Sequence, residues 1–132
     1  MAFTGAADDQ LAIRNLHDAY ADAVFQRDAQ LWGNNWAADA RWDLMGTSVA
    51  GREAIVALWV QAMAGFQFVG FFSQIGALEI AGDQATGRVF THEVLELGDG
   101  TISRPVGRYD DNYIKVDGRW LFEARRYSLL KG

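Results

Sequence analysis

The residues best suited to chemistry lie in the last third of the sequence, within residues 107–127. Tyr109, Asp111 and Tyr113 are spaced by two, so an extended strand places all three side chains on one face. Arg125 lies on the next segment, where an inward arginine could bind a substrate carboxylate or steady Asp111. A salt bridge at a sheet edge or dimer interface is the alternative for the arginine, and cross-strand packing is the alternative for the tyrosines.

His92 lies in the middle of another expected strand. If it faces inward, it could pair with Asp111 or Glu93 and act as a general base, because imidazole titrates near neutral pH. The simpler interpretation is a histidine that faces solvent or is satisfied in the core. His17 falls beside the apolar stripe of the first helix, so we expect it to be structural or exposed. Two isolated histidines without clustered carboxylates predict no metal site, and we expect no cofactor.

Aromatic side chains are dense, at 13% of the residues. Most are expected to form the core. At this density some rings, such as Trp42, Trp59 and Phe71, are expected to line a cavity. Such a cavity would suit a small apolar or aromatic molecule.

Helices come first in the sequence and strands second. Apolar spacing predicts helices from Asp8 to about Arg27, after Asp28 and over 52–63. Strands are expected over 40–45, 66–74, 77–81, 84–97, 101–116 and 119–130, with a loop bounded by Gly46 and Gly51. Gly82-Asp83, Gly98-Asp99-Gly100 and Asp117-Gly118 predict consecutive hairpins. This order predicts one α+β domain over 1–132.

Composition excludes several classes of partner. The net charge is −5 and the arginines are scattered, so we expect no nucleic acid and no anionic membrane surface as partner. The apolar runs are too short to span a bilayer, and residues 1–9 do not resemble a signal peptide. The chain has no cysteine, which makes the cytoplasm the default location.

The order of these elements resembles the SnoaL-like branch of the NTF2-like superfamily. The resemblance rests on Tyr20, Asp28, Trp36–Ala40, Gly51–Ile55, Leu78–Asp83, Gly107–Tyr109 and Asp117–Trp120. It implies a cone-shaped, curved antiparallel sheet wrapped around three N-terminal helices, with an internal pocket. It also implies a homodimer that pairs through the outer face of the sheet.

Enzymes of this kind include scytalone dehydratase, dehydrochlorinases, polyketide cyclases and ketosteroid isomerase. The dehydratases and dehydrochlorinases use an Asp–His dyad, and the resemblance places Phe25 and Phe71 at those two positions. The ketosteroid isomerase pattern places Tyr20 and Asp111 at the donors that polarise a carbonyl, but it places Leu44 where the general base should be.

Three functions are compatible with the sequence. The first is a cofactor-independent lyase or isomerase for a small cyclic apolar substrate, with Tyr20, His92 and Asp111 as the catalytic candidates. Phe25, Trp42, Trp59, Phe71, Tyr109, Tyr113 and Arg125 are then the expected binding residues. The second is a non-catalytic binding module that has lost the dyad. The third is a dimerisation domain whose interior is filled by its own rings.

Overall fold

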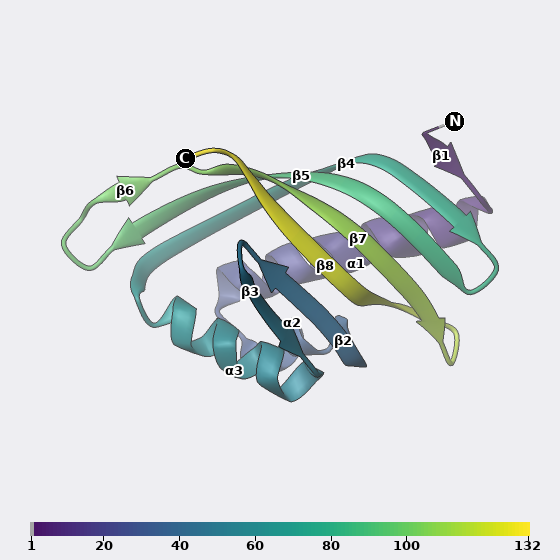
Figure 1. Cartoon of the computed structure of the whole chain (residues 1–132), viewed down its shortest axis with the longest axis horizontal. Helices are drawn as coiled ribbons and strands as arrows, with labels where there is room; N and C mark the ends of the chain where they lie inside the picture. The colour runs from purple at the N-terminus through teal and green to yellow at the C-terminus, as the bar shows by residue number, and fades with distance from the viewer. Residues whose placement is uncertain (1) are drawn as a thin grey trace.

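A strongly curved sheet bends around three helices in the computed structural model, which describes residues 2–132 (Figure 1). The helices are α1 (Ala7–Gln26), α2 (Ala29–Gly33) and α3 (Arg52–Met63). The strands are β1 (Phe3–Thr4), β2 (Trp36–Leu44), β3 (Thr47–Ala50), β4 (Phe66–Ala81), β5 (Gln84–Leu97), β6 (Ile102–Ser103), β7 (Val106–Val116) and β8 (Arg119–Lys131). The α+β class, with a curved sheet around three helices, is confirmed.

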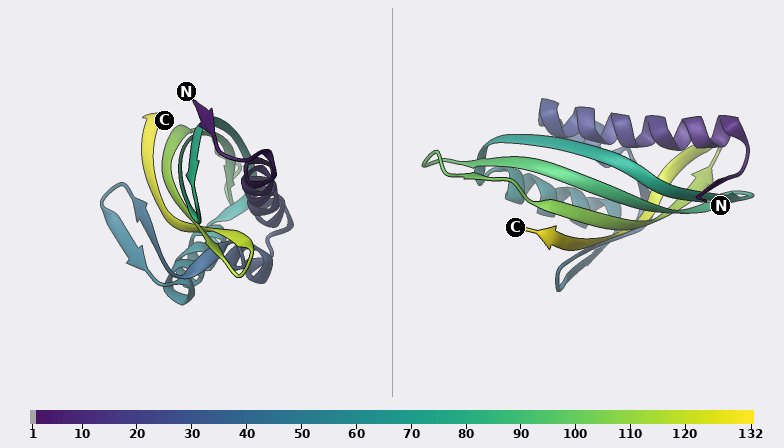
Figure 2. Two further views of the ribbon diagram at one scale, coloured as in Figure 1. Left: turned by 90° about the vertical axis from the view of Figure 1, so that its right-hand side faces the viewer. Right: turned by 90° about the horizontal axis from the view of Figure 1, so that it is seen from above.

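The strands follow the order β1-β4-β5-β7-β8-β2-β3, and β6 pairs with β5. The consecutive antiparallel pairs β4–β5, β5–β7 and β7–β8 form the predicted meander. The sheet as a whole is mixed, because β1 pairs with β4 and β2 pairs with β8 in parallel. The concave side faces the helices, and α1 runs along the length of the sheet (Figure 2).

Helix α1 packs against the sheet through the stripe that its spacing predicts. Ile13, Leu16, Tyr20 and Val24 are all buried. The start of the helix differs from the prediction, since residue 6 is the N-cap and makes no side-chain hydrogen bond. Asp9 instead accepts hydrogen bonds from strand residues 115 and 120, which ties the first turn to the β7–β8 hairpin.

After α1, the second helix is shorter than the sequence predicts, and more residues belong to strands. Asp28 caps α2 by accepting a hydrogen bond from the backbone N–H of Leu31. Trp36 is not helical, because it already begins β2 and pairs with β8. The expected loop between Gly46 and Gly51 contains β3, which forms a hairpin with β2.

Strand β4 is continuous, although two strands were expected over its length. A register shift between Ile75 and Ala77 lets it bend without ending. Gly76 is required at this bend, because a Cβ atom there would lie 2.9 Å from the Phe90 ring. By contrast, the single strand expected over 101–116 is divided into two strands, β6 and β7. Pro105 lies at the break, where its missing N–H cannot pair.

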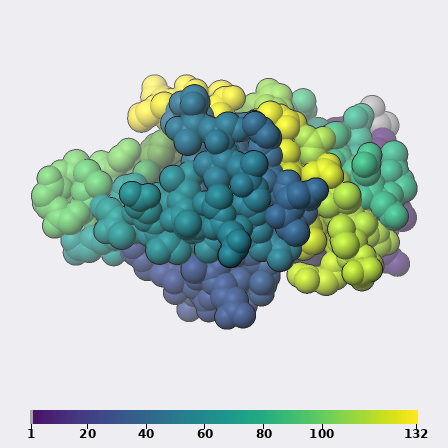
Figure 3. All heavy atoms as spheres, turned by 60° about the horizontal axis from the view of Figure 1, so that its bottom comes forward, coloured from purple at the N-terminus to yellow at the C-terminus, as the bar shows by residue number. Residues whose placement is uncertain are grey.

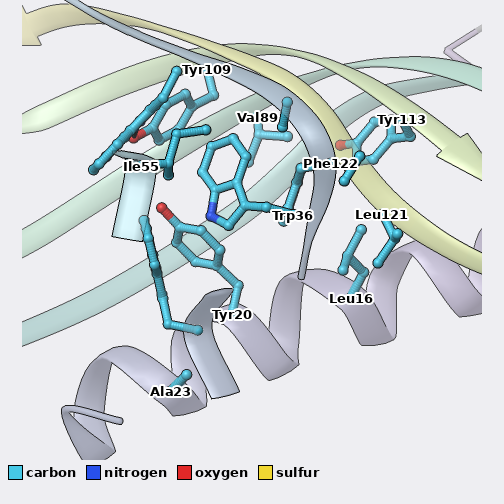
Figure 4. Close-up of a cluster of buried hydrophobic side chains, with 14 of the residues drawn as sticks. Leu16, Tyr20, Ala23, Trp36, Ile55, Val89, Tyr109, Tyr113, Leu121 and Phe122 are labelled. Atoms are coloured by element: carbon cyan, nitrogen blue, oxygen red, sulfur yellow. Dashed lines mark hydrogen bonds between the residues drawn. The ribbon is translucent and has the colours of Figure 1, made fainter. Parts of the chain in front are cut away.

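Aromatic rings fill the middle of the cone. Trp36, Tyr20 and Phe122 pack together there, and Figure 4 shows Tyr20 rising from α1 toward Trp36. Trp32 stacks on Trp59 with ring centroids 4.6 Å apart. Large rings supply much of the burial energy of a small domain, so this cluster holds α1, α2 and α3 against the sheet.

Within residues 2–132, no helix has the length and apolar character of a membrane span.

Candidate functional site

A cavity of about 450 Å³ lies between the sheet and helices α1 and α3. Its wall is mostly apolar and aromatic. The lining residues are Tyr20, Val24, Trp42, Leu44, Met45, Trp59, Ala62, Met63, Phe66, Val69, Phe71, Glu93, Leu95, Ser103, Pro105, Tyr109, Tyr127, Leu129 and Gly132. Figure 3 shows three of the segments that contribute to the wall, the blue β2–β3 hairpin, the yellow end of β8 and the green segment around β6. The size and lining are typical of a small-molecule site.

Glu93 carries the single carboxylate side chain among these lining residues. It is the cross-strand partner of Phe71, so both side chains belong to the concave face of the sheet. Burial raises the pKa of Glu93 from 4.5 to about 7, while the positive charge of Arg125 opposes the rise. The carboxyl group can therefore accept or donate a proton near neutral pH.

Three phenols line the cavity, and two of them, those of Tyr20 and Tyr109, are buried, whereas Tyr127 is half-buried. Burial raises the pKa of both hydroxyl groups, so both are neutral donors at physiological pH. The indole Nε1–H of Trp42 donates to the hydroxyl oxygen of Tyr109 at 3.1 Å. This bond leaves the proton of the Tyr109 hydroxyl available for another acceptor.

A buried ion pair lies behind this wall. Asp111 accepts hydrogen bonds from Nε of Arg125 at 2.8 Å and from its Nη2 at 3.1 Å. Both side chains are fully buried, and such bidentate pairs are among the strongest in proteins. Burial lowers the pKa of Arg125, but the Asp111 carboxylate outweighs that effect, so the guanidinium stays charged.

His17 extends this network from α1. Its Nε2 lies 2.6 Å from the Tyr113 hydroxyl, which donates to Asp111 at 3.2 Å. Because the hydroxyl proton is used in that bond, Nε2 of His17 must carry the proton shared with Tyr113. Burial, together with the charge of Arg125, holds the pKa of His17 well below its usual value, so the ring is neutral. His17 therefore proves to be a buried structural residue rather than an exposed one.

Most of the expected catalytic and binding residues line the cavity or lie just behind its wall. Tyr20, Trp42, Trp59, Phe71 and Tyr109 line it. Three more expected residues, numbers 111, 113 and 125, form the buried network behind the wall.

Two expected site residues are placed elsewhere. His92 is exposed, because it alternates with the inward-facing Glu93 and so points to the convex face beside Phe72. The catalytic hypothesis that depends on an inward His92 is therefore wrong. Phe25 is 42% exposed and packs against Phe68 and Phe72 outside the cavity.

The positions expected to hold an acid–base dyad are apolar in the folded protein. Val24, the neighbour of Phe25, lines the cavity, as does Phe71. Leu44 lines it as well, while the adjacent Asp43 accepts a hydrogen bond from Ser48 on another surface. The dyad of the dehydratases and the general base of the isomerases are thus both absent from these positions.

Glu93 is the residue that the sequence interpretation missed as a site in its own right. The signal was strand parity, since Glu93 continues the inward row of Val89 and Thr91, which alternates with the exposed Phe90 and His92 along β5. A lone carboxylate in such an inward row must be satisfied or functional. Among residues 2–132, no three His, Asp or Glu side chains form a group that could hold a metal ion.

Family comparison agrees with this architecture. A model described as the SnoaL-like domain matches residues 5–126. The chain belongs to the SnoaL-like family. Its fold is that of the wider NTF2-like superfamily, which includes dehydratases and dehydrochlorinases. Among curated proteins, none matches this sequence.

Solved structures show the same fold. A variant of Rv3472, described as a protein of unknown function from Mycobacterium tuberculosis, is 25% identical, with a TM-score of 0.85 over 94% of this chain and 77% of its own. An NTF2-like protein with a cystatin-like fold from Novosphingobium aromaticivorans is 24% identical, with a TM-score of 0.80 over 95% and 84%. Hexachlorocyclohexane dehydrochlorinase LinA-type3 from Novosphingobium barchaimii LL02 is 19% identical, with a TM-score of 0.80 over 93% and 87%.

Proposed function

We propose that this SnoaL-like protein is a cofactor-independent lyase or isomerase that moves a proton on a small, cyclic and largely apolar substrate. The observation that supports the proposal is the Glu93 carboxyl group, which lines an apolar cavity and has a pKa of about 7. A general base is most effective when its pKa lies near the working pH. Glu93, rather than His92, is thus the proposed general base.

The location of Glu93 explains how the reaction class of the family can survive without its dyad. The position to which the resemblance assigns the histidine is occupied by Phe71. Glu93 lies directly across the β4–β5 ladder from it. Directly opposed residues of an antiparallel pair have Cβ atoms about 5 Å apart, so the basic group has moved by one strand while staying in the same part of the cavity.

Tyr20 and Tyr109 supply the second requirement of proton abstraction. When a base removes a proton beside a carbonyl group, negative charge develops on the carbonyl oxygen. Neutral phenols that lie in an apolar wall can donate hydrogen bonds to that oxygen. The proton taken by Glu93 is then returned to another carbon, as in an isomerase, or a leaving group departs, as in a lyase.

The charge of the cavity wall favours a neutral substrate. Arg125 does not line the cavity, and Glu93 is the single lining residue with a carboxylate side chain. A substrate with a carboxylate or phosphate group would lose its hydration without gaining a direct cationic partner. The volume and the aromatic lining suit one to three rings with a single carbonyl oxygen.

A non-catalytic binding module is the second candidate function. It is favoured by the apolar residues Phe25 and Phe71, to which the resemblance assigns the two dyad positions. The two functions differ in one observable property, because a binding module holds a ketone without exchanging its α-protons.

The test is deuterium exchange into a panel of one- to three-ring ketones in D₂O, followed by proton NMR. Wild-type protein should exchange α-protons of at least one ketone faster than buffer alone. Glu93→Gln should reduce that rate by about 10²- to 10⁴-fold, the usual contribution of a general base. The control is Glu79→Gln, which removes an exposed carboxylate of β4 and should leave the rate unchanged.

Binding of the same ketones is measured in parallel by fluorescence of the cavity tryptophans. Binding without exchange above the buffer rate would favour the binding module. Exchange that persists unchanged in Glu93→Gln would show that another group moves the proton. Dimer formation through the outer sheet face and a cytoplasmic location remain predictions.

A further inference from the structure

The Asp111–Arg125 ion pair is buried more deeply than the proposed reaction requires. Taking two charges out of water is expensive, and a well-packed apolar pair of similar size is often as stable or more stable. Tyr113 and His17 are committed to the same network, so four polar side chains from α1, β7 and β8 are held in the core. Stability alone gives a weak reason for this arrangement.

The pair has a definite orientation relative to the cavity. The guanidinium carbon of Arg125 lies 3.8 Å from the centre of the Tyr109 ring and 4.7 Å from that of Tyr20, and both rings line the cavity. Asp111 takes the edge of the guanidinium formed by Nε and Nη2. Arg125 therefore stands directly behind the cavity wall, with its countercharge on another side.

The groups that experience this charge come from several elements. Around Glu93 of β5 the titratable or charged groups are Tyr20 from α1, Tyr109 from β7, and Tyr127 with Arg125 from β8. The three phenols are neutral near pH 7, so Arg125 is the single permanent charge among these neighbours. In a water-poor interior such a charge acts over several ångströms.

We propose that Arg125 is a positioning residue of the site, which acts through Glu93 and the two wall tyrosines by making negative charge in the cavity less costly. Asp111, Tyr113 and His17 fix the place of that positive charge. This inference rests on the proposed function, since it assigns to the same site a reaction that passes through an anion. It commits the chemistry to an enolate-like or carbanion-like intermediate.

The test is the titration of the Glu93 side-chain carboxyl carbon, followed by carbon-13 NMR and assigned by its loss in Glu93→Gln. Arg125→Met should raise the titration midpoint by about one pH unit or more, because an opposite charge nearby favours the ionised form. Asp111→Asn should lower the midpoint, because it removes the negative charge that partly cancels Arg125. Arg126→Met is the matched control, since Arg126 is exposed and should leave the midpoint unchanged.

The expected shifts of the Glu93 midpoint have opposite signs in Arg125→Met and Asp111→Asn. This difference distinguishes an electrostatic role of Arg125 from a purely structural one. Loosening of the core would move both midpoints toward the value of a solvated glutamate. Shifts of the same sign, or no shift, in Arg125→Met and Asp111→Asn would therefore overturn the proposal.

Either single variant leaves one buried charge without its partner and could fail to fold. The double variant Asp111→Leu with Arg125→Met removes both charges and is expected to fold, as apolar replacements of buried pairs often do. It should still raise the Glu93 midpoint, and an unchanged midpoint in a folded double variant would overturn the proposal.

The titration needs no substrate, so it is independent of the exchange assay. If Glu93→Gln retains exchange while the midpoints shift as expected, the proposed function fails and the electrostatic role of Arg125 stands. If the midpoints do not respond while exchange depends on Glu93, the inference about Arg125 fails alone.

Discussion

Replacing Glu93 by glutamine should change how stability depends on pH. Below pH 4.5 the carboxyl group is protonated in both the folded and the unfolded chain, so it adds no pH dependence. Between pH 4.5 and about 7 the unfolded chain releases the proton while the folded protein keeps it. Stability must then fall as pH rises through this window, because the folded state binds more protons than the unfolded state.

The size of the effect follows from the shift in pKa. A rise from 4.5 to about 7 corresponds to a loss of up to about 3 kcal/mol of folding free energy at pH 8 relative to pH 4. Glutamine has nearly the same shape and cannot ionise, so Glu93→Gln should not show this loss. Relative to wild type, the variant should gain stability steadily from pH 4.5 to about 7 and then level off.

Urea unfolding at intervals from pH 4 to pH 8.5 measures the difference directly. Taking the difference between the two proteins removes the contributions of other groups, such as the buried His17. Glu79→Gln serves as the control and should follow wild type at every pH, since Glu79 is exposed on β4. A stability difference between Glu93→Gln and wild type that stays constant with pH would refute the reasoning.

Two further substitutions test how the cavity is built. Gly107→Ala should lower the free energy of unfolding by about 1–3 kcal/mol in urea denaturation, because a Cβ atom there would collide with the phenol ring of Tyr127; an unchanged stability would contradict this packing. Arg27→Gly keeps the left-handed backbone at φ 54° but removes hydrogen bonds to the carbonyls of Met63 and Phe66. It should lower the melting temperature by about 3–5 °C, as a loss near 1 kcal/mol does in a domain of roughly this length, and an unchanged value would show that this contact is unimportant.

The meander and the first helix are the parts of the fold that the sequence predicts well. The turn pairs at residues 82–83 and 117–118 each require a tight reversal, and both end a strand as expected. The stripe of α1 is equally clear, because its four large apolar residues recur at helical spacing. Local signals of this kind depend on a few neighbouring residues.

The parallel pairing of β2 with β8 could not be predicted in the same way. Trp36 lies just after a short helix, and its strand conformation is set by pairing with a distant segment around Phe122. The bend of β4 at Gly76 likewise depends on the Phe90 ring of the neighbouring strand. Tertiary contacts decide both features, and propensity carries little information about them.

The sequence predicts several residues of the cavity wall, but not the carboxyl group that we propose as its acid–base group. The placement of Tyr20, Trp42 and Phe71 at the cavity follows from periodicity and resemblance together. The sequence suggested His92 because histidine is the usual general base. Strand alternation places Glu93 in the cavity instead, and His92 is exposed. The raised pKa of that carboxyl group depends on how much water the folded cone excludes, which no local pattern encodes.

The most direct test of the account is the titration of Glu93 in the unmodified protein. A pH titration followed by carbon-13 NMR of its side-chain carboxyl carbon should give a midpoint near pH 7. Such a group can exchange protons with a substrate at neutral pH. A midpoint near 4.5 would mean that Glu93 is solvated and ionised, and it would contradict the central claim that this residue is the acid–base group of the cavity.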